Sequence, residues 1–262
     1  MAEDILLEER DGIATITFNR PDQRNAISYQ MWLDLQRLLV DLEGSDRVRA
    51  VVFTGAGSEA FSAGADIKDF DLYRDSAAKA RVYAAASEGA MDMAETLSKP
   101  TIALIKGYCM GGACELTTAL DLRIAADNAR LGIPAARLGI TIGYKEMRRL
   151  VEVVGPATAK YMLLTARQLK AEEALRLGLV HAVLPLSEIE EFTYTLAKEV
   201  AALGPMAHRL NTRVLRKVME DPFLRSLTPE EEALPFQVFD SEDYREGRRA
   251  FLEKRRPSFR GR

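Results

Sequence analysis

Two glycine-rich segments hold the residues whose types and spacing could do chemistry. The first reads Phe-Ser-Ala-Gly-Ala-Asp-Ile-Lys over residues 61–68, and the second reads Lys-Gly-Tyr-Cys-Met-Gly-Gly-Ala-Cys-Glu-Leu over residues 106–116. Small residues let a ligand approach the backbone closely, and amide N–H groups that converge on one carbonyl oxygen form an oxyanion hole. Glu115 follows Gly112 within one helical turn, where its carboxylate could reach the carbon beside that carbonyl. The pattern indicates acid/base chemistry next to a stabilised oxyanion.

Each segment has a plainer explanation when it is taken alone. A junction of strand, glycine and helix is common in tight packing, and a glutamate near a helix start is commonly a surface residue favoured by the helix dipole. The joint occurrence of both segments, in this order, favours the catalytic interpretation.

Alternating strand and helix patterns surround these segments. The apolar runs 50–54 and 101–105 predict buried strands ahead of the two glycine-rich segments, and Asp11-Gly12 predicts a hairpin turn near the N-terminus. Repeated strand-then-helix units predict an α/β fold with a largely parallel sheet covered by helices. The pattern is almost wholly helical after residue 186. We therefore expect a core of residues 1–199 with the active site, followed by a helical region of residues 200–262.

Composition narrows the functional classes. The chain has 262 residues, a formal net charge of -3 and a hydrophobic share of 47%, values typical of a globular protein without general attraction to nucleic acid or anionic membranes. No apolar run approaches the roughly 20 residues of a membrane span, and the N-terminus lacks a signal-peptide pattern, so we expect a cytoplasmic protein. The two cysteines, Cys109 and Cys114, fit neither a CxxC site nor a disulfide framework, and with only two histidines we expect no metal.

Several motifs together resemble the crotonase superfamily, the enoyl-CoA hydratase/isomerase proteins. The matching segments are 19–26, 61–66, 99–107, 111–115, 121–126, 169–183 and 240–256. The resemblance covers nearly the whole chain. It implies a crotonase-type spiral of ββα turns with a C-terminal helical region that builds homotrimers, alone or paired as hexamers. It also implies an acyl-CoA substrate, with coenzyme A as part of that substrate and no other cofactor.

The resemblance assigns roles residue by residue. The backbone amides of Ala65 and Gly112 would form the oxyanion hole, and Glu115 matches the first of two hydratase glutamates. Phe251 and Lys254 match tail positions that in relatives approach coenzyme A bound to a neighbouring subunit. The other implied coenzyme A-binding residues are Arg24, Ala26, Ala63, Asp66, Ile67, Lys68 and Gly111.

One position departs from the family's pattern. Hydratases carry a second glutamate in a Gly-x-Pro-Glu motif, whereas this chain reads Leu-Gly-Ile-Pro-Ala over residues 131–135, which places Ala135 there. Two carboxylates can orient one water while one of them delivers a proton, and alanine can do neither. Tyr144 or Glu146, in the segment that follows, could supply a replacement polar group.

Three chemistries are compatible with this pattern. Hydration or dehydration of an enoyl-CoA, the reaction of an acyl-CoA lyase, is the preferred interpretation, with Glu115 as the acid/base. Decarboxylation of a malonyl-type thioester needs only the oxyanion hole and a proton donor. Double-bond isomerisation usually relies on the glutamate that is missing.

Other classes of function are weaker. The Gly-Ala-Gly of residues 55–57 follows a strand, but no helix pattern follows it as dinucleotide binding would require. Basic residues near the C-terminus alternate with glutamates, which is typical of a solvated helix face rather than of an RNA-binding surface. A non-catalytic scaffold is a further alternative, and the presence of Glu115 argues against it.

Overall fold

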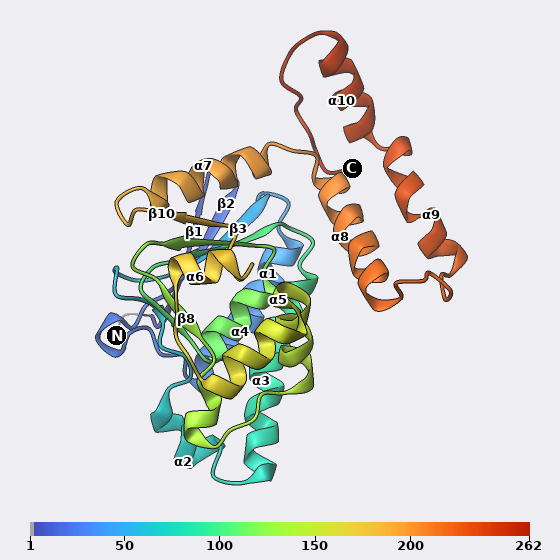
Figure 1. The fold of residues 1–262 in the computed structure, drawn as a ribbon. Helices are drawn as coiled ribbons and strands as arrows, with labels where there is room; N and C mark the ends of the chain where they lie inside the picture. The colour runs from blue at the N-terminus through green and yellow to red at the C-terminus, as the bar shows by residue number, and fades with distance from the viewer. Residues whose placement is uncertain (1–2) are drawn as a thin grey trace.

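The fold is a spiral in which successive turns add one strand to each of two sheets. The computed structural model describes residues 3–262 (Figure 1). The larger sheet has the order β1 (Ile5–Arg10), β2 (Ile13–Phe18), β3 (Ala50–Gly55), β5 (Thr101–Ile105), β7 (Leu122–Ala126), β10 (Ala182–Leu184). The smaller sheet has the order β4 (Ala60–Ser62), β6 (Tyr108–Met110), β8 (Arg130–Gly132), β9 (Leu169–Lys170). The strand pairs β3–β4, β5–β6 and β7–β8 therefore each cross from the first sheet to the second, which is the ββα repeat expected from the sequence.

Most neighbouring strands are parallel, as the sequence predicts. The exceptions are β1 with β2 and β8 with β9, which pair antiparallel. The β1–β2 hairpin turns at Asp11 and Gly12, which have φ angles of 54° and 78°. The predicted hairpin at Asp11-Gly12 is confirmed, because glycine accepts this backbone conformation without a side-chain clash.

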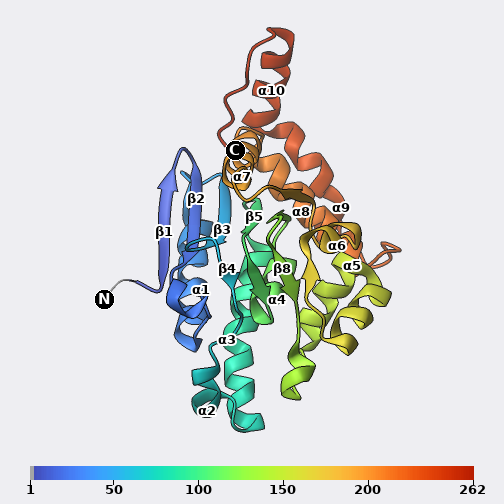
Figure 2. The ribbon, with the colours of Figure 1, turned by 60° about the vertical axis from the view of Figure 1, so that its left-hand side comes forward.

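Helices cover the sheets and connect the turns of the spiral (Figures 1 and 2). They are α1 (Tyr29–Gly44), α2 (Phe70–Tyr73), α3 (Ala77–Thr96), α4 (Gly112–Ala119), α5 (Tyr144–Thr165), α6 (Ala171–Arg176) and α7 (Ile189–Ala201). Short 3-10 turns precede several of them: η1 (Pro21–Gln23), η2 (Ile67–Asp69) and η3 (Ala135–Leu138). Ser28 caps α1 by accepting a hydrogen bond from the amide of Met31 at 3.2 Å, which satisfies an amide that has no intrahelical partner.

The main core lies between the sheets and helices α1, α3 and α4. Trp32, Leu35, Phe53 and Phe61 are among its fully buried side chains. Burying an aromatic or aliphatic side chain of this size contributes about 1.5–3 kcal/mol, so the core holds α1, α3 and α4 in fixed positions against the sheets. These are the elements from which the candidate site is built.

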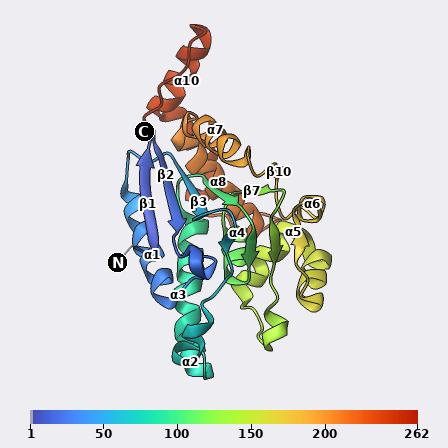
Figure 3. The ribbon, with the colours of Figure 1, turned by 90° about the vertical axis from the view of Figure 1, so that its left-hand side faces the viewer.

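The C-terminal helices extend away from this body. They are α8 (Pro205–Glu220), α9 (Pro229–Gln237) and α10 (Glu242–Leu252), with η4 (Val238–Asp240) between the last two. In all three ribbon views α10 lies at one end of the molecule and α2 at the other (Figures 1, 2 and 3). Phe223, Phe236 and Phe251 on this arm are each more than half exposed. The boundary near residue 200 and the assembly of this arm into trimers both stay predictions.

None of the helices within residues 3–262 combines the length and the apolar character that crossing a membrane would require.

Candidate active site

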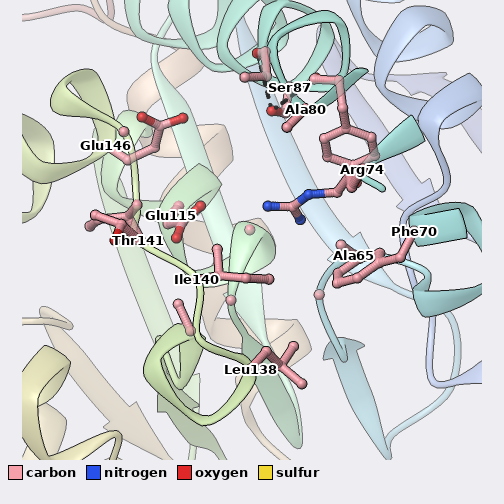
Figure 4. Close-up of a pocket in the computed structure, with 18 of the residues that line it drawn as sticks. Ala65, Phe70, Arg74, Ala80, Ser87, Glu115, Leu138, Ile140, Thr141 and Glu146 are labelled. Atoms are coloured by element: carbon pink, nitrogen blue, oxygen red, sulfur yellow. Dashed lines mark hydrogen bonds between the residues drawn. The ribbon is translucent and has the colours of Figure 1, made fainter. Parts of the chain in front are cut away.

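A cavity of about 640 Å³ lies where the two glycine-rich segments meet α3 and the start of α5. Its lining includes most of the loop 63–67, the start of α4, and residues of η3 and the segment 140–143. Figure 4 shows two facing sets of side chains, with Glu115 and Glu146 on one side and Arg74 and Phe70 on the other. The cavity therefore has two opposing walls, one with the two carboxylates and one with the guanidinium.

The two glycine-rich segments touch each other at the floor of the cavity. Gly64 has a φ of 98°, and a side-chain carbon built on it would lie 2.7 Å from the carbonyl oxygen of Met110 and 3.7 Å from Cα of Gly111. Only glycine fits both the backbone angle and this close approach. The contact places Ala65 and Gly112, each one residue further along its segment, beside the same cavity.

The amides of Ala65 and Gly112 are left without acceptors in the described part of the chain. Ile27 pairs with the first segment: its amide donates to the carbonyl of Gly64 at 2.8 Å, and its carbonyl accepts from the amide of Asp66 at 2.9 Å. The amide of Ala65, between these two residues, takes no part in the pairing. Gly112 is the first residue of α4, where backbone amides have no intrahelical acceptor and the helix dipole is positive. Two N–H groups are thus available at one end of the cavity.

Glu115 lies one turn further along α4 and faces the cavity. Its Oε2 atom is 3.9 Å from the position that a side-chain carbon on Gly112 would occupy. Burial raises the pKa of Glu115 to about 8, the carboxylate of Glu146 adds to the rise, and the guanidinium of Arg74 opposes it. Near neutral pH this carboxyl therefore retains a proton that it can deliver, which is the behaviour expected of a general acid.

Glu146 provides a second carboxylate in the same cavity. It lies in the first turn of α5, only 5% of it is exposed, and its Oε2 atom has no hydrogen-bond partner among residues 3–262. Burial raises its pKa as well, and the nearby Glu88 carboxylate acts in the same direction. A side chain at Gly143 would collide with Glu146 Oε2, so this glycine makes room for the carboxylate.

The start of α5 is clamped to α3. Arg149, one turn beyond Glu146, is almost fully buried and donates from Nε to Glu95 Oε2 at 2.8 Å and from Nη2 to Asp92. Lys145 also pairs with Asp92 across the two helices. These ion pairs fix the direction in which α5 begins, and with it the side chain that points into the cavity.

The segment expected from the sequence to depart from the family's pattern lies along the cavity. Ala135 begins η3 and lines the cavity, but it contributes no polar group there. Tyr144 is 97% exposed and is not part of the lining, so the structure does not bring it together with Glu115. Of the two replacements considered from the sequence, Glu146 is the one whose side chain lies in the cavity.

The opposite wall holds an arginine that the sequence patterns did not single out. Arg74 directly follows α2, and its guanidinium lies over the rings of Phe70 and Tyr83, 4.7 Å and 4.9 Å from their centroids. The Tyr83 hydroxyl accepts a hydrogen bond from Trp32 Nε1 at 3.1 Å, and burial raises its pKa to about 12, so it stays protonated. No spacing rule marks Arg74, because α2 is a single turn without a helical pattern of its own.

The other residues expected to bind coenzyme A are distributed around the cavity and beyond it. Asp66 is buried and accepts from Arg20 Nη2 at 2.8 Å and from the amide of Lys68 at 3.1 Å, which fixes the loop. Ala63, Ala65, Ile67, Gly111 and Gly112 line the cavity, whereas Arg24, Ala26, Asp66 and Lys68 do not. Arg24 instead lies over the ring of Tyr108 at 5.3 Å. Phe251 lies in α10 and Lys254 just after it, on the C-terminal arm, and neither lines the cavity of its own chain.

Known proteins resemble this chain in sequence over nearly its whole length. A family model described as "Enoyl-CoA hydratase/isomerase" matches residues 8–262. The chain is 35% identical over 257 residues to the crotonyl-CoA hydratase of Syntrophomonas wolfei, with 98% of both chains covered. It is 34% identical over 252 residues to the short-chain-enoyl-CoA hydratase of Clostridium acetobutylicum, with 96% of this chain and 95% of the relative covered.

Solved structures agree with the sequence comparisons. An enoyl-CoA hydratase/carnitine racemase from Magnetospirillum magneticum superposes with a TM-score of 0.96 at 32% identity, covering 100% of this chain and 97% of the other. The fold and the matched family model define a crotonase-type protein. The chain belongs to the enoyl-CoA hydratase/isomerase family.

Proposed function

We propose that this protein adds water across the 2,3-double bond of an enoyl-CoA, and removes it in reverse, with Glu115 and Glu146 as the working carboxylates. The observation that supports this most is the second buried carboxylate. Although Ala135 stands where a hydratase glutamate is expected, Glu146 enters the same cavity from the start of α5 (Figure 4). The site thereby regains the two carboxylates that hydration needs.

The thioester carbonyl would be held by the amides of Ala65 and Gly112. As water attacks C3, electron density moves through C2 onto the thioester oxygen, and fixed N–H dipoles stabilise that developing charge. Little free energy is needed to orient these amides, because the Gly64 contact and the start of α4 already position them. Removing one oxyanion-hole donor typically lowers kcat by about 10²–10³.

The two carboxylates would divide the protons between them. Burial raises the pKa of both carboxyls, and the carboxylate of Glu146 further disfavours ionisation of Glu115, whose pKa of about 8 means that it keeps its proton near neutral pH. The ionised member takes a proton from the attacking water, whose oxygen bonds to C3. The protonated member, which we assign to Glu115, delivers its proton to C2. The sum is the addition of H and OH across the double bond, with no change of oxidation state.

The decisive experiment separates hydration from the other thioester reactions by mass. The purified protein is incubated with enoyl-, 3-hydroxyacyl- and malonyl-type CoA esters in heavy water, and product masses are followed. We expect gain of water on an enoyl-CoA with one carbon-bound deuterium at C2, and a loss of about 10³ in kcat in the Glu115→Gln variant.

Other outcomes would point elsewhere. Loss of carbon dioxide from a malonyl-type ester would establish decarboxylation instead, and movement of the double bond without water gain would establish isomerisation. A Glu115→Gln variant as active as the parent would remove Glu115 from the mechanism.

We also propose that the C-terminal arm, residues 200–262, assembles the chain into homotrimers or paired trimers. The exposed phenylalanines of α8–α10 support this, since a free arm would leave a large apolar surface in water. In such an assembly Phe251 and Lys254 would approach coenzyme A on the neighbouring subunit. Sedimentation of the parent and of a Phe236→Glu variant would test the arrangement.

A further inference from the structure

The wall opposite Glu115 contains a guanidinium without a counter-charge. Arg74 is half-buried, lines the cavity and points into it (Figure 4). Within residues 3–262 its side chain makes neither an ion pair within 4.0 Å nor a hydrogen bond, and its contacts are the faces of Phe70 and Tyr83. Stacked aromatic rings hold the guanidinium in place and leave its N–H donors unused.

Two of the acidic side chains near Arg74 in the sequence have other partners. Asp75 pairs with Lys79 at 2.8 Å, and Asp69 accepts a hydrogen bond from the amide of Tyr29. Glu115 shares the cavity with Arg74 but makes no ion pair with it. A partly desolvated cation with free donors is costly unless an anion joins it, and the cavity in front of it is where that anion would come from.

A short series of contacts places Arg74 near Gly112 at the start of α4, whose amide would hold the thioester carbonyl. The ring of Trp32 lies 3.4 Å from the position of a side-chain carbon on Gly112, and Trp32 Nε1 donates to the hydroxyl of Tyr83. Arg74 lies over the ring of that tyrosine at 4.9 Å. The hydroxyl of Tyr83 donates to no other described residue, so it adds a second unused donor at the same wall.

We propose that Arg74 binds a carboxylate carried at the far end of the substrate's acyl chain, so that the preferred substrate is the CoA monothioester of an unsaturated dicarboxylic acid. The inference rests on the proposed hydration and specifies its substrate class. The planar guanidinium can hold a carboxylate through two parallel N–H···O bonds. A neutral acyl chain of the same length would exclude water from this wall and leave the guanidinium without a partner, which disfavours its binding.

Binding by Arg74 fits a carboxylate that stays on the substrate better than one that leaves. An ion pair stabilises the carboxylate in the ground state and is lost when carbon dioxide forms, so it would oppose decarboxylation. In hydration the carboxylate is unchanged, and its binding orients C2 and C3 against Glu115 and Glu146.

Two anions could reach the guanidinium, the acyl carboxylate or a phosphate of coenzyme A, and the test separates them. Unreactive saturated esters are used first: succinyl-, glutaryl- and adipyl-CoA, each beside its terminal carboxamide. Dissociation constants are measured by calorimetry for the parent, for Arg74→Gln and Arg74→Lys, and for Lys79→Gln, which removes one exposed positive charge five residues away.

We expect the parent to bind the best-fitting carboxylate about 10- to 100-fold more tightly than its carboxamide, the range of a charge-assisted hydrogen-bonded pair. Arg74→Gln should bring that ratio close to one while carboxamide binding persists. Arg74→Lys should retain part of the preference, and Lys79→Gln all of it. Circular dichroism and the persistence of carboxamide binding confirm that the variants are folded.

Equal binding of carboxylate and carboxamide by the parent, or a preference that survives in Arg74→Gln, would overturn the inference. Pantetheine thioesters, which lack the phosphates of the nucleotide part, identify the anion. If Arg74→Gln weakens carboxylate and carboxamide CoA esters alike and has no effect on pantetheine esters, the guanidinium binds phosphate and the inference fails. A carboxylate preference without hydration of the matching enoyl-CoA would refute the proposed reaction and leave the recognition by Arg74 standing.

Discussion

The two walls of the cavity are built on opposite electrostatic principles. On one wall Glu115 and Glu146 are carboxylates held close together, without positive partners in the chain as described, and burial raises the pKa of both. On the other wall Arg74 is a cation stacked on aromatic rings, beside a tyrosine hydroxyl that stays neutral. Glu146 Oε2 and the Arg74 guanidinium have no hydrogen-bond partner among residues 3–262, so each wall presents a polar group that a substrate could bind.

The difference between the walls matches the proposed division between chemistry and substrate selection. The carboxylate wall stands on α4 and α5, whose positions are fixed by the core and by the Arg149 ion pairs. On the cationic wall Tyr83 belongs to the core helix α3, but Arg74 directly follows α2, a single helical turn after the loop of the first glycine-rich segment. Catalytic groups need fixed geometry, whereas a binding wall can change with the acyl group it serves. Three predictions test this division, in order of expected effect.

Glu146→Gln should act on the reaction rather than on recognition. Loss of a carboxylate that activates water is expected to lower kcat by about 10²-fold, and the ratio of carboxylate to carboxamide binding should not change. Single-turnover kinetics with a matching enoyl-CoA measures the effect. The matched control is Glu152→Gln on the same helix, a residue paired with Arg148. An unchanged kcat in Glu146→Gln would show that Glu115 works alone.

The stability of the protein should fall with rising pH on account of Glu115. Its folded-state pKa of about 8 lies above the ordinary value of 4.5, so the folded state holds this proton more tightly than the unfolded chain. The stabilising contribution is fully present below pH 4.5 and is lost as the pH rises to about 8. The measured quantity is the difference in the free energy of unfolding between Glu115→Gln and the parent. Because water in the cavity screens the carboxylate, we expect this difference to shift by about 2 kcal/mol in favour of the variant between pH 5 and pH 9.

Urea denaturation at the two pH values measures this difference. Arg74→Gln serves as the comparison from the opposite wall. It keeps Glu115, so its stability should still fall with rising pH as that of the parent does, because arginine itself remains charged throughout the range. Parallel stability profiles for the parent and Glu115→Gln would mean that Glu115 titrates near its ordinary value and that the carboxylate wall is not desolvated.

Of the three changes, Tyr83→Phe should have the smallest effect on activity, and it alters a side chain of the cationic wall only. The change leaves Trp32 Nε1 without its acceptor, which costs about 1–2 kcal/mol of stability. We expect kcat to change by less than about threefold and carboxylate binding to weaken by a similar factor, since one neutral hydrogen bond contributes little. Tyr73→Phe is the control, because Tyr73 stacks on Tyr29 and does not line the cavity. If Tyr83→Phe lowered kcat more than Glu146→Gln does, the cationic wall, and not the carboxylate wall, would carry the chemistry.

Much of the fold could be predicted from local patterns. The strands Ala50–Gly55 and Thr101–Ile105 follow from buried apolar runs, and the Asp11-Gly12 turn follows from its residue types. The short strands of the second sheet are different. β4, β6 and β8 have three residues each, too few to show a period, and they form because the longer strands before them deliver the chain to the same edge.

Residue identity and short spacing are enough to predict that the two glycine-rich segments and Glu115 lie together, because Gly64, Gly112 and Glu115 are placed by the backbone of their own segments. The family resemblance adds the expectation that Ala135 stands at the position of a hydratase glutamate. Which other groups complete the cavity depends on the tertiary structure. Glu146 rather than Tyr144 faces inward because ion pairs with α3 set the direction of α5, and Arg74 faces inward because Phe70 and Tyr83 stack on it. Both depend on where a loop brings a helix, which no local pattern encodes.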